Sequence, residues 1–248
     1  MATIFLTSSP TGPLDGSRQV DGLDKMNYFA ENLKNRWKEN SANLMITAFP
    51  SSYEASEEMT DFFRRTVEKE GLTISCFDLL DDRNQSDFSR EKLQAYDVIW
   101  LGGGHVPTQN RFFQSLGLRE KLEGFTGMII GISAGSMNSA DLVYAEPEEE
   151  GEAIDPSFEK FLSGLNLTRQ MILPHYQMVK DKWLDGKRLF EDIVFPDSRD
   201  ERIEKILNLP DGSYLLIEGG NEMVYGEAWL IRDGRMDKIC ENKQVYVL

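Results

Sequence analysis

Residues 98–105 and 128–136, which read VIWLGGGH and MIIGISAGS, decide the fold of this chain. Each stretch is a short apolar run of strand length that ends in glycines, and one helix-length segment, residues 106–125, separates the two runs. A strand that returns through one helix to a neighbouring strand is the repeating unit of a parallel sheet. The two glycine junctions are therefore expected at the carboxyl ends of adjacent strands, where open parallel sheets bind their ligands.

The same alternation of apolar runs and helical stretches continues toward the amino end of the chain. Further strand candidates lie at residues 3–6, 44–48 and 73–77. Between them, residues 23–38 and 56–70 carry apolar side chains along one helical stripe. We predict a three-layer αβα fold, in which helices cover both faces of a mainly parallel sheet.

The pattern after Ser133 is less regular. It predicts a short helix at residues 158–165, a strand at 171–173 and a charged helix at 197–207 that Ser198 would cap. The tail contains four short apolar runs separated by turn residues, at 214–217, 222–225, 228–231 and 244–247. We expect these runs to form a C-terminal antiparallel β meander. Because no stretch has the composition of a linker, we expect residues 1–248 to form a single α/β domain.

Composition excludes several classes of protein. The chain has 27 Lys and Arg against 42 Asp and Glu, a net charge of -15 that repels phosphate backbones and anionic lipids. Two cysteines, Cys76 and Cys240, are too few for a zinc cluster or a disulfide framework. The apolar runs are far shorter than the roughly 20 residues of a membrane span, and the first residues lack the basic flank of a signal peptide. We expect a soluble cytoplasmic protein with no nucleic-acid or membrane partner and no cofactor or metal; the sequence leaves a monomer and a homodimer both open.

The second glycine junction contains the best candidate nucleophile. Gly131 and Gly135 flank Ser133, and small neighbours are what a sharp strand-to-helix turn needs when it presents a hydroxyl above a sheet. The helix that follows offers free N–H groups and the positive end of its dipole to an oxyanion. The alternative is a loop that binds phosphate, or a chance match to the motif.

A serine needs a base, and the chain contains only two histidines. His175 follows the predicted strand at 171–173, which places it at the same edge of the sheet as Ser133, so it is the favoured base. His105 ends the first glycine junction, residues 102–105, here called the glycine loop, where it would line the substrate pocket. The carboxylate that would orient the base stays open among those between Ser133 and His175: Asp141, Glu146, Glu148, Glu149, Glu150, Glu152, Asp155 and Glu159.

Three motifs resemble those of a known family. Gly102-Gly103-Gly104, Gly131-Ile132-Ser133-Ala134-Gly135 and Pro174-His175-Tyr176 are similar to the motifs of the serine peptidases typified by dipeptidase E and cyanophycinase. The fold of these peptidases is similar to flavodoxin and to the class I glutamine amidotransferase domain. The resemblance covers nearly the whole chain and implies a peptidase-like α/β domain with Ser133 as nucleophile and His175 as base.

The resemblance also suggests the remaining site residues. Spacing from Ser133 places Glu148 nearest to the family's acidic triad member, with Glu146 and Glu150 as rivals. Independently of the resemblance, the triple glycine offers a backbone N–H near Gly103 or Gly104, with Gly104 favoured, that would form the oxyanion hole together with the N–H of Ala134. Gly103 and His105 on this loop would bind substrate, and the resemblance suggests that Arg199 would recognise the acidic residue of Asp-X dipeptides. The family commonly has Asn where this chain has His105.

The sequence therefore favours a serine-type hydrolase of small peptides or amides that acts through a Ser-His-acid triad. An α/β-hydrolase fold also uses Gly-x-Ser-x-Gly, but it would place more of its sheet before the histidine than this chain does. The opposing interpretation is a catalytically silent binding or regulatory domain that keeps the same fold, because a fold alone does not determine function.

Overall fold

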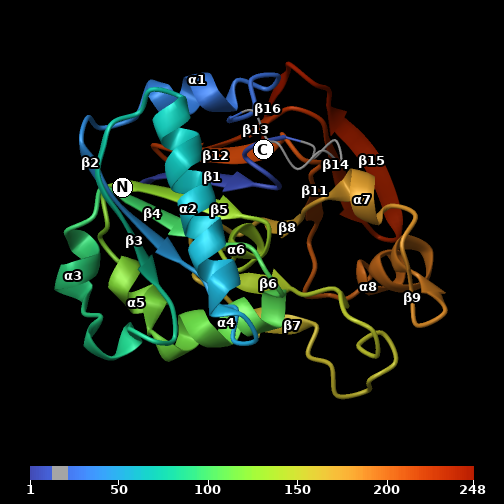
Figure 1. Ribbon diagram of the computed structural model, residues 1–248. Helices are drawn as coiled ribbons and strands as arrows, with labels where there is room; N and C mark the ends of the chain where they lie inside the picture. The colour runs from blue at the N-terminus through green and yellow to red at the C-terminus, as the bar shows by residue number, and fades with distance from the viewer. Residues whose placement is uncertain (13–21) are drawn as a thin grey trace.

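The computed structural model describes residues 1–12 and 22–248, and its centre is a large sheet (Figure 1). Within the described residues this sheet has eight strands in the order β16-β13-β12-β1-β5-β4-β2-β3. The strands are β1 (Thr3–Thr7), β2 (Ser41–Ile46), β3 (Ile74–Leu80), β4 (Val98–Leu101), β5 (Met128–Ile132), β12 (Tyr214–Glu218), β13 (Asn221–Tyr225) and β16 (Val245–Val247). Strands β1 to β5 pair in parallel, whereas β12, β13 and β16 add antiparallel strands beside β1. The predicted mainly parallel α/β sheet is confirmed.

Helices cover both faces of this sheet because its inner parallel strands, β1, β2, β4 and β5, are buried on both sides. In β4, Trp100 packs into one core, while Ile99 and Leu101 pack into the other. The first core contains side chains of α1 (Phe29–Lys34) and α2 (Tyr53–Lys69). The second contains side chains of α3 (Arg90–Gln94), α4 (Val106–Ser115) and α5 (Leu118–Leu122).

A second sheet lies beside the large one and carries the order β15-β14-β11-β8. Its strands are β8 (Met171–Leu173), β11 (Ile206–Asn208), β14 (Ala228–Arg232) and β15 (Arg235–Cys240). Strands β8 and β11 are parallel, and the other pairs are antiparallel. The four predicted tail segments are strands, but they do not form one meander. The chain crosses from β13 in the large sheet to β14 in the second one, because each sheet offers a free edge that the local pattern does not reveal.

Two predicted helices are wrong. Residues 158–165 contain the strand β7 (Phe161–Ser163), which pairs with β6 (Leu142–Tyr144) and so gains a partner that its own sequence does not show. The charged stretch 197–207 is mostly turn. The Ser198 hydroxyl donates to the carbonyl of Phe195 and accepts from the N–H of Gly234, so this residue ends a helix instead of starting one.

The remaining elements are short. They are η1 (Gln85–Asp87), α6 (Ala134–Met137), α7 (Tyr176–Val179), β9 (Trp183–Leu184), β10 (Lys187–Arg188), the π-helical turn η2 (Leu189–Val194) and α8 (Phe195–Asp197). In the part of the chain that the structure describes, every helix is too short or too polar to cross a membrane.

Candidate active site

Ser133 occupies a strained turn between β5 and α6. Its backbone has φ 50° and ψ -115°, a conformation that non-glycine residues rarely adopt. A Cβ on Gly131 would lie 2.9 Å from the Cα of Ser136, and a Cβ on Gly135 would overlap the carbonyl oxygen of Leu101. Only glycine fits on either side, so the Gly-x-Ser-x-Gly motif is a packing requirement of this turn.

His175 contacts the hydroxyl of Ser133. The Nε2 atom of His175 lies 2.8 Å from the Oγ of Ser133, so the two residues are within hydrogen-bond distance, as the strand order predicts. His175 follows β8 and Pro174 and has φ 59°, which turns its side chain toward the large sheet's carboxyl edge. Its backbone N–H donates to the Oγ of Ser8 at 2.8 Å, which holds this left-handed conformation.

The carboxylate that contacts His175 is Asp211. Its Oδ1 atom lies 2.6 Å from the Nδ1 atom of the ring, and its side chain is only 3% exposed. Strands β8 and β11 continue their pairing as far as the bond from the N–H of Leu209 to the carbonyl of Leu173, so the loops that follow them stay adjacent. The Asp211 N–H donates to the Oε1 of Gln177 at 3.0 Å, which fixes this loop.

Glu148 is therefore not the carboxylate that orients His175. Its Oε2 atom accepts from the N–H of Val106 at 3.2 Å, at the start of α4. Sequence reasoning missed Asp211 because it considered only carboxylates between Ser133 and His175. The available signal was the turn Pro210-Asp211-Gly212, which follows a strand parallel to the one before His175.

Ser8 is a further polar residue that sequence reasoning missed. It lies immediately after β1 and is fully buried. Its Oγ donates to Oδ1 of Asp211 at 2.7 Å, the same oxygen that His175 contacts, and lies 3.5 Å from Nδ1 of His175. The site thus draws one residue from each of four strand ends: Ser8 after β1, Ser133 after β5, His175 after β8 and Asp211 after β11.

The glycine loop lies against Ser133. A Cβ on Gly103 would be 3.5 Å from the Cβ of Ser133, so the loop backbone is in contact range of the candidate nucleophile. Gly104 has φ +130°, and its neighbours Gln109 and Phe49 leave no room for a side chain. The Nε2 of Gln109 donates to the carbonyl of Gly103 at 2.6 Å and holds the loop in place.

His105, at the end of this loop, contacts the acidic segment that follows β6. Its Nε2 lies 2.8 Å from Oε1 of Glu152, and its Nδ1 lies 2.9 Å from the hydroxyl of Thr108. In the described chain, His105, Glu149 and Glu152 bring one potential metal-ligand atom each within 4.8 Å of one another. The two hydrogen bonds of His105 already satisfy both ring nitrogens, so this group needs no metal.

Burial raises the pKa values of two glutamates in the same segment. The pKa of Glu146 is well above its ordinary value because the side chain is buried and because Glu148 lies nearby. Burial also raises the pKa of Glu148, although the N–H of Val106 partly offsets this effect. Both groups therefore hold a proton more readily than a solvated carboxylate does.

Arg199 is placed differently from these residues. Its Nη1 donates to the carbonyl of Phe195 at 3.4 Å, and its guanidinium lies directly beside Gly234. Within the described parts of the chain, none of its contacts is with Ser133, His175 or Asp211.

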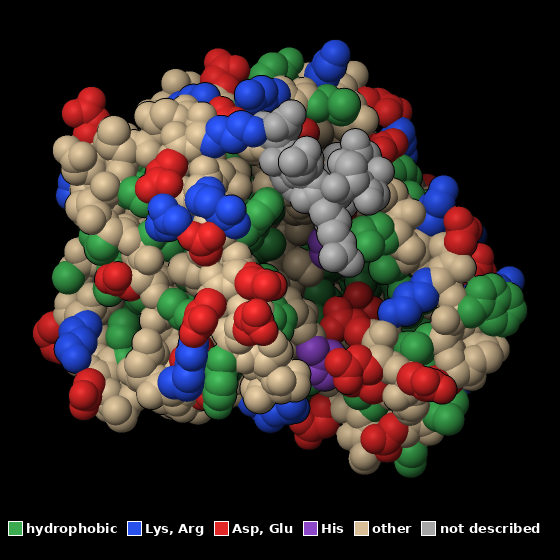
Figure 2. Space-filling view, in the orientation of Figure 1, with side chains coloured by type: hydrophobic (Ala, Val, Ile, Leu, Met, Phe, Trp, Pro, Cys, Tyr) green, Lys and Arg blue, Asp and Glu red, His purple; other side chains and the backbone are tan. Residues whose placement is uncertain are grey.

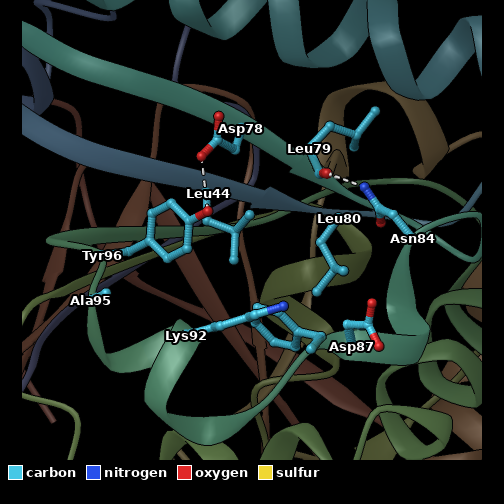
Figure 3. Close-up of a pocket in the computed structure, with 10 residues that line it drawn as sticks. Leu44, Asp78, Leu79, Leu80, Asn84, Asp87, Lys92, Ala95 and Tyr96 are labelled. Carbon is cyan, nitrogen blue, oxygen red and sulfur yellow. Dashed lines mark hydrogen bonds between the residues drawn. The ribbon is translucent and has the colours of Figure 1, made fainter.

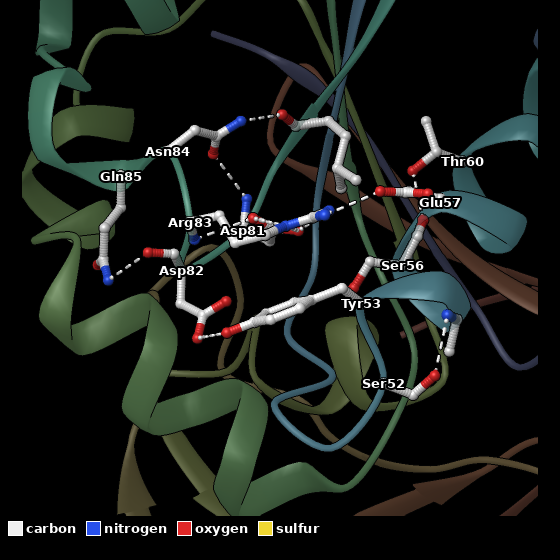
Figure 4. A network of polar contacts seen from close by, with 12 residues as sticks. Ser52, Tyr53, Ser56, Glu57, Thr60, Asp81, Asp82, Arg83, Asn84 and Gln85 are labelled. Carbon is white, nitrogen blue, oxygen red and sulfur yellow. Dashed lines mark hydrogen bonds and ion pairs between the residues drawn. The ribbon is translucent and has the colours of Figure 1, made fainter.

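Two other polar regions lack a nucleophile and base pair. A cavity of about 530 Å³ lies beside β3, where Tyr96 donates to Asp78 at 2.8 Å (Figure 3). Near the start of α2, Arg83 pairs with Asp81 and Glu57 (Figure 4). This network connects α2 to the end of β3, and its ion pairs are complete, so it is a structural feature.

Comparisons with known proteins identify the family and the fold of this chain. The model of peptidase family S51 matches residues 14–224. A peptidase from an acI-B1 Actinobacterium has a similar crystal structure, with a TM-score of 0.65 and 14% identity over 100% of this chain and 97% of that one. A putative peptidase E protein from Listeria monocytogenes EGD-e is similar with a TM-score of 0.54 and 17% identity, over 97% of this chain and 100% of that one. The search of curated proteins found no match. The predicted family is confirmed: the chain belongs to peptidase family S51, and it is a serine peptidase.

Proposed function

We propose that Ser133, His175 and Asp211 form the triad that hydrolyses small peptides or amides. The observation that supports this most strongly is the continuous line of contacts from the Ser133 hydroxyl to His175 at 2.8 Å and from His175 to Asp211 at 2.6 Å. This is the arrangement that nucleophile, base and orienting carboxylate need in a serine hydrolase, whatever their order in the sequence.

The reaction follows from these positions. The Oγ of Ser133 attacks the scissile carbonyl carbon while its proton moves to Nε2 of His175. Asp211 accepts the hydrogen bond from Nδ1 and stabilises the imidazolium that forms. The proton then passes to the leaving amine as the C–N bond breaks, and water, activated by the same histidine, hydrolyses the acyl-enzyme.

The oxyanion would be held by backbone N–H groups. Those of Ala134, at the start of α6, and Gly104, on the loop beside Ser133, are the proposed donors, and removal of one such donor typically costs about 2.7–4 kcal/mol of transition-state stabilisation. Gly103 and His105 would line the substrate side of the loop. Recognition of Asp-X dipeptides by Arg199 stays a prediction from the family resemblance.

Labelling with a fluorophosphonate tests this function. We expect the wild type to be labelled at Ser133, with labelling abolished in Ser133→Ala and strongly reduced in His175→Ala. Asp211→Asn should reduce the labelling rate by roughly 10²- to 10⁴-fold, because the ring loses the partner that fixes its tautomer. Glu148→Gln is the matched control and should keep the rate close to that of the wild type. Labelling that persists in Ser133→Ala, or that falls in Glu148→Gln but not in Asp211→Asn, contradicts the proposal.

A further inference from the structure

Strand β15 leaves one edge of the second sheet open. The sheet has the order β15-β14-β11-β8, so in the described part of the chain β15 pairs only with β14. Figure 1 shows β15 at the outer border of the molecule. Met236 packs against a core cluster and Cys240 is buried, so the strand is held in place while its outer edge stays open. Such an edge is a template for one further strand.

The backbone groups that face the open edge belong to Met236 and Lys238. Residues 233–234, with φ 52° and 77°, form the two-residue turn between β14 and β15. The pair that closes this turn, Arg232 with Arg235, exchanges hydrogen bonds, and antiparallel pairs alternate between bonded and non-bonded ones. Met236 and Lys238 therefore direct their N–H and C=O groups away from β14.

Two charged side chains of β15 are exposed and have no ionic partner within the described residues. They are Arg235 and Asp237, which lie two positions apart and so share one face of the strand. The charge that follows them is engaged, because Lys238 pairs with Glu227 and Glu241. Figure 2 shows basic side chains next to acidic ones along the upper right border, where Figure 1 places β15. The open edge thus carries one cation and one anion that are both free to pair.

These two charges select one register for the pairing of β15 with a second copy of itself. A two-fold axis can place Met236 opposite Met236 of the second copy, and Arg235 then lies opposite Asp237 of that copy, with the pair repeated by symmetry. A shift by two residues in one direction places Asp237 opposite Asp237. A shift in the other direction places Arg235 opposite Arg235. Both neighbouring registers therefore bring like charges together, which destabilises them.

We propose that the open edge of β15 binds β15 of a second copy of this chain, with Met236 on the two-fold axis. The Met236 backbone groups of the two copies bond to each other, and the N–H of Lys238 donates to the carbonyl of Gly234 of the second copy. The N–H of Gly234 is already engaged with the Oγ of Ser198 and takes no part. Two ion pairs between Arg235 and Asp237 complete the contact.

This interface goes beyond the proposed function, because it contains none of the three triad residues. One short strand from each copy gives a small contact, which is typical of a weak dimer that forms in a concentration-dependent way. An unrelated extended peptide would gain the same backbone bonds but not the two matched charges. The charge match therefore favours a second copy as the occupant.

Sedimentation velocity of the full chain measures this association. We expect the wild type to pass from monomer to dimer between about 1 μM and 1 mM protein, the range in which weak complexes form. The ionic strength is held at about 0.15 M, so that the net charge of -15 on each copy is screened. A wild type that stays monomeric over the whole range overturns the proposal.

Charge reversal tests the register. Asp237→Arg and Arg235→Asp should each raise the dissociation constant about tenfold or more, because each turns both attractive cross-strand pairs into repulsive ones. Asp237→Arg also lowers the net negative charge, so a general loss of repulsion would tighten the dimer instead. Asp181→Arg, which changes the net charge equally at a side chain that is 90% exposed, is the matched control and should not weaken the dimer. Circular dichroism checks that each variant is folded.

Two recombinations complete the test. The double variant Arg235→Asp/Asp237→Arg exchanges the charges and should restore the affinity of the wild type. An equimolar mixture of the two single variants should associate more tightly than either variant alone, because every cross-strand pair in the mixed dimer joins opposite charges. A dimer that neither single reversal weakens, or a mixture that associates no better than its components, overturns the proposed interface.

Discussion

Ser8 joins Asp211 and His175, the carboxylate and the base of the proposed triad. Its hydroxyl donates to the carboxylate of Asp211 and accepts from the backbone N–H of His175. A single buried side chain therefore fixes both the orientation of the carboxylate and the left-handed backbone that carries the ring. We regard Ser8 as a positioning residue, because it acts through these two residues.

Ser8→Ala should lower the maximal rate of fluorophosphonate labelling by about tenfold or more, since it leaves a buried N–H and a buried carboxylate oxygen without their partner. The probe concentration that gives half of the maximal rate should stay close to its wild-type value, because Ser8 does not line the probe's path. Ser8→Thr retains a hydroxyl and should recover most of the rate. A loss of equal size in Ser8→Thr would contradict the positioning role.

The buried carboxyl of Glu146 predicts a pH-dependent effect on stability. Its pKa is raised in the folded state by burial and by Glu148, so the folded chain binds a proton that the unfolded chain releases above the ordinary value of 4.5. Stability therefore falls as the pH rises from that value toward the raised pKa. Lys182 and Glu152 also face this group and moderate the effect in opposite directions.

Glu146→Gln removes this titration. The variant should be more stable than the wild type at pH 8, and the difference should shrink as the pH falls to 4, because both side chains are then neutral. Urea denaturation at the two pH values measures the free energies of unfolding. A difference that is the same at both pH values would show that the ionised form of Glu146 is not disfavoured in the fold.

At the residue scale, the sequence predicted the contacting pair Ser133 and His175 and missed the two residues that contact His175 on its other side. Ser133 and His175 are recognisable because each follows a strand, and the chain has only two histidines. Ser8 is not marked by any local motif, and the turn Pro210-Asp211-Gly212 points to Asp211 only once the pairing of the preceding strand is known. Their roles depend on which strand ends meet, and the contact between Ser8 and Asp211 joins positions 203 residues apart.

The turn from β5 to α6 is the element on which the site depends most. It brings Gly135 so close to β4 that even a methyl group would overlap the carbonyl of Leu101. Backbone atoms cannot move aside as a flexible side chain can, so the strain of an added methyl group has no local relief.

Gly135→Ala should destabilise the fold by about 1–3 kcal/mol, the usual cost of overpacking. Gly103→Ala is the matched control, because its Cβ would meet ordinary contacts, the nearest at 3.5 Å from Ser133. The control should lose little stability. Thermal unfolding of both variants measures the difference, and equal melting temperatures would contradict the packing argument.

The sequence predicted strands correctly where burial on both faces makes a strand apolar along its whole length. Strands β1, β2, β4 and β5 are buried on both faces, so each of them is visible as a short apolar run, whereas the edge strand β3 is only partly buried. Prediction failed at 158–165 and 197–207, where local periodicity favours a helix but the observed strands and turns depend on partners distant in the sequence. The division of the tail between two sheets has the same cause, since turn residues fix a hairpin but not the sheet that it joins.

The whole molecule carries a net charge of -15, which opposes its compaction. Exposed ion pairs such as Arg64 with Glu68 offset little of this repulsion, because surface pairs contribute only about 0–1 kcal/mol. Added salt shortens the Debye length from about 30 Å at 0.01 M to about 8 Å at 0.15 M and screens the repulsion between distant carboxylates.

The melting temperature should therefore rise when sodium chloride is increased from 0.01 M to 0.15 M. Differential scanning calorimetry at constant pH and buffer composition measures the shift. A fall in melting temperature over this range would mean that attractive ion pairs outweigh the net repulsion, contrary to our expectation.

The position of strand β1 inside the sheet determines when the site can be completed during synthesis of the chain. It lies inside the sheet between β5 and β12, and Ser8 at its end contacts Asp211. A ribosome releases the amino end first, so β1 and Ser133 emerge well before β12 and Asp211 exist, and domains generally fold as units once their partners are available. A nascent chain that already exposes Ser133 still lacks Asp211, the carboxylate of the proposed triad. Under the proposed mechanism, the growing polypeptide therefore acquires its complete triad only when its synthesis is nearly finished.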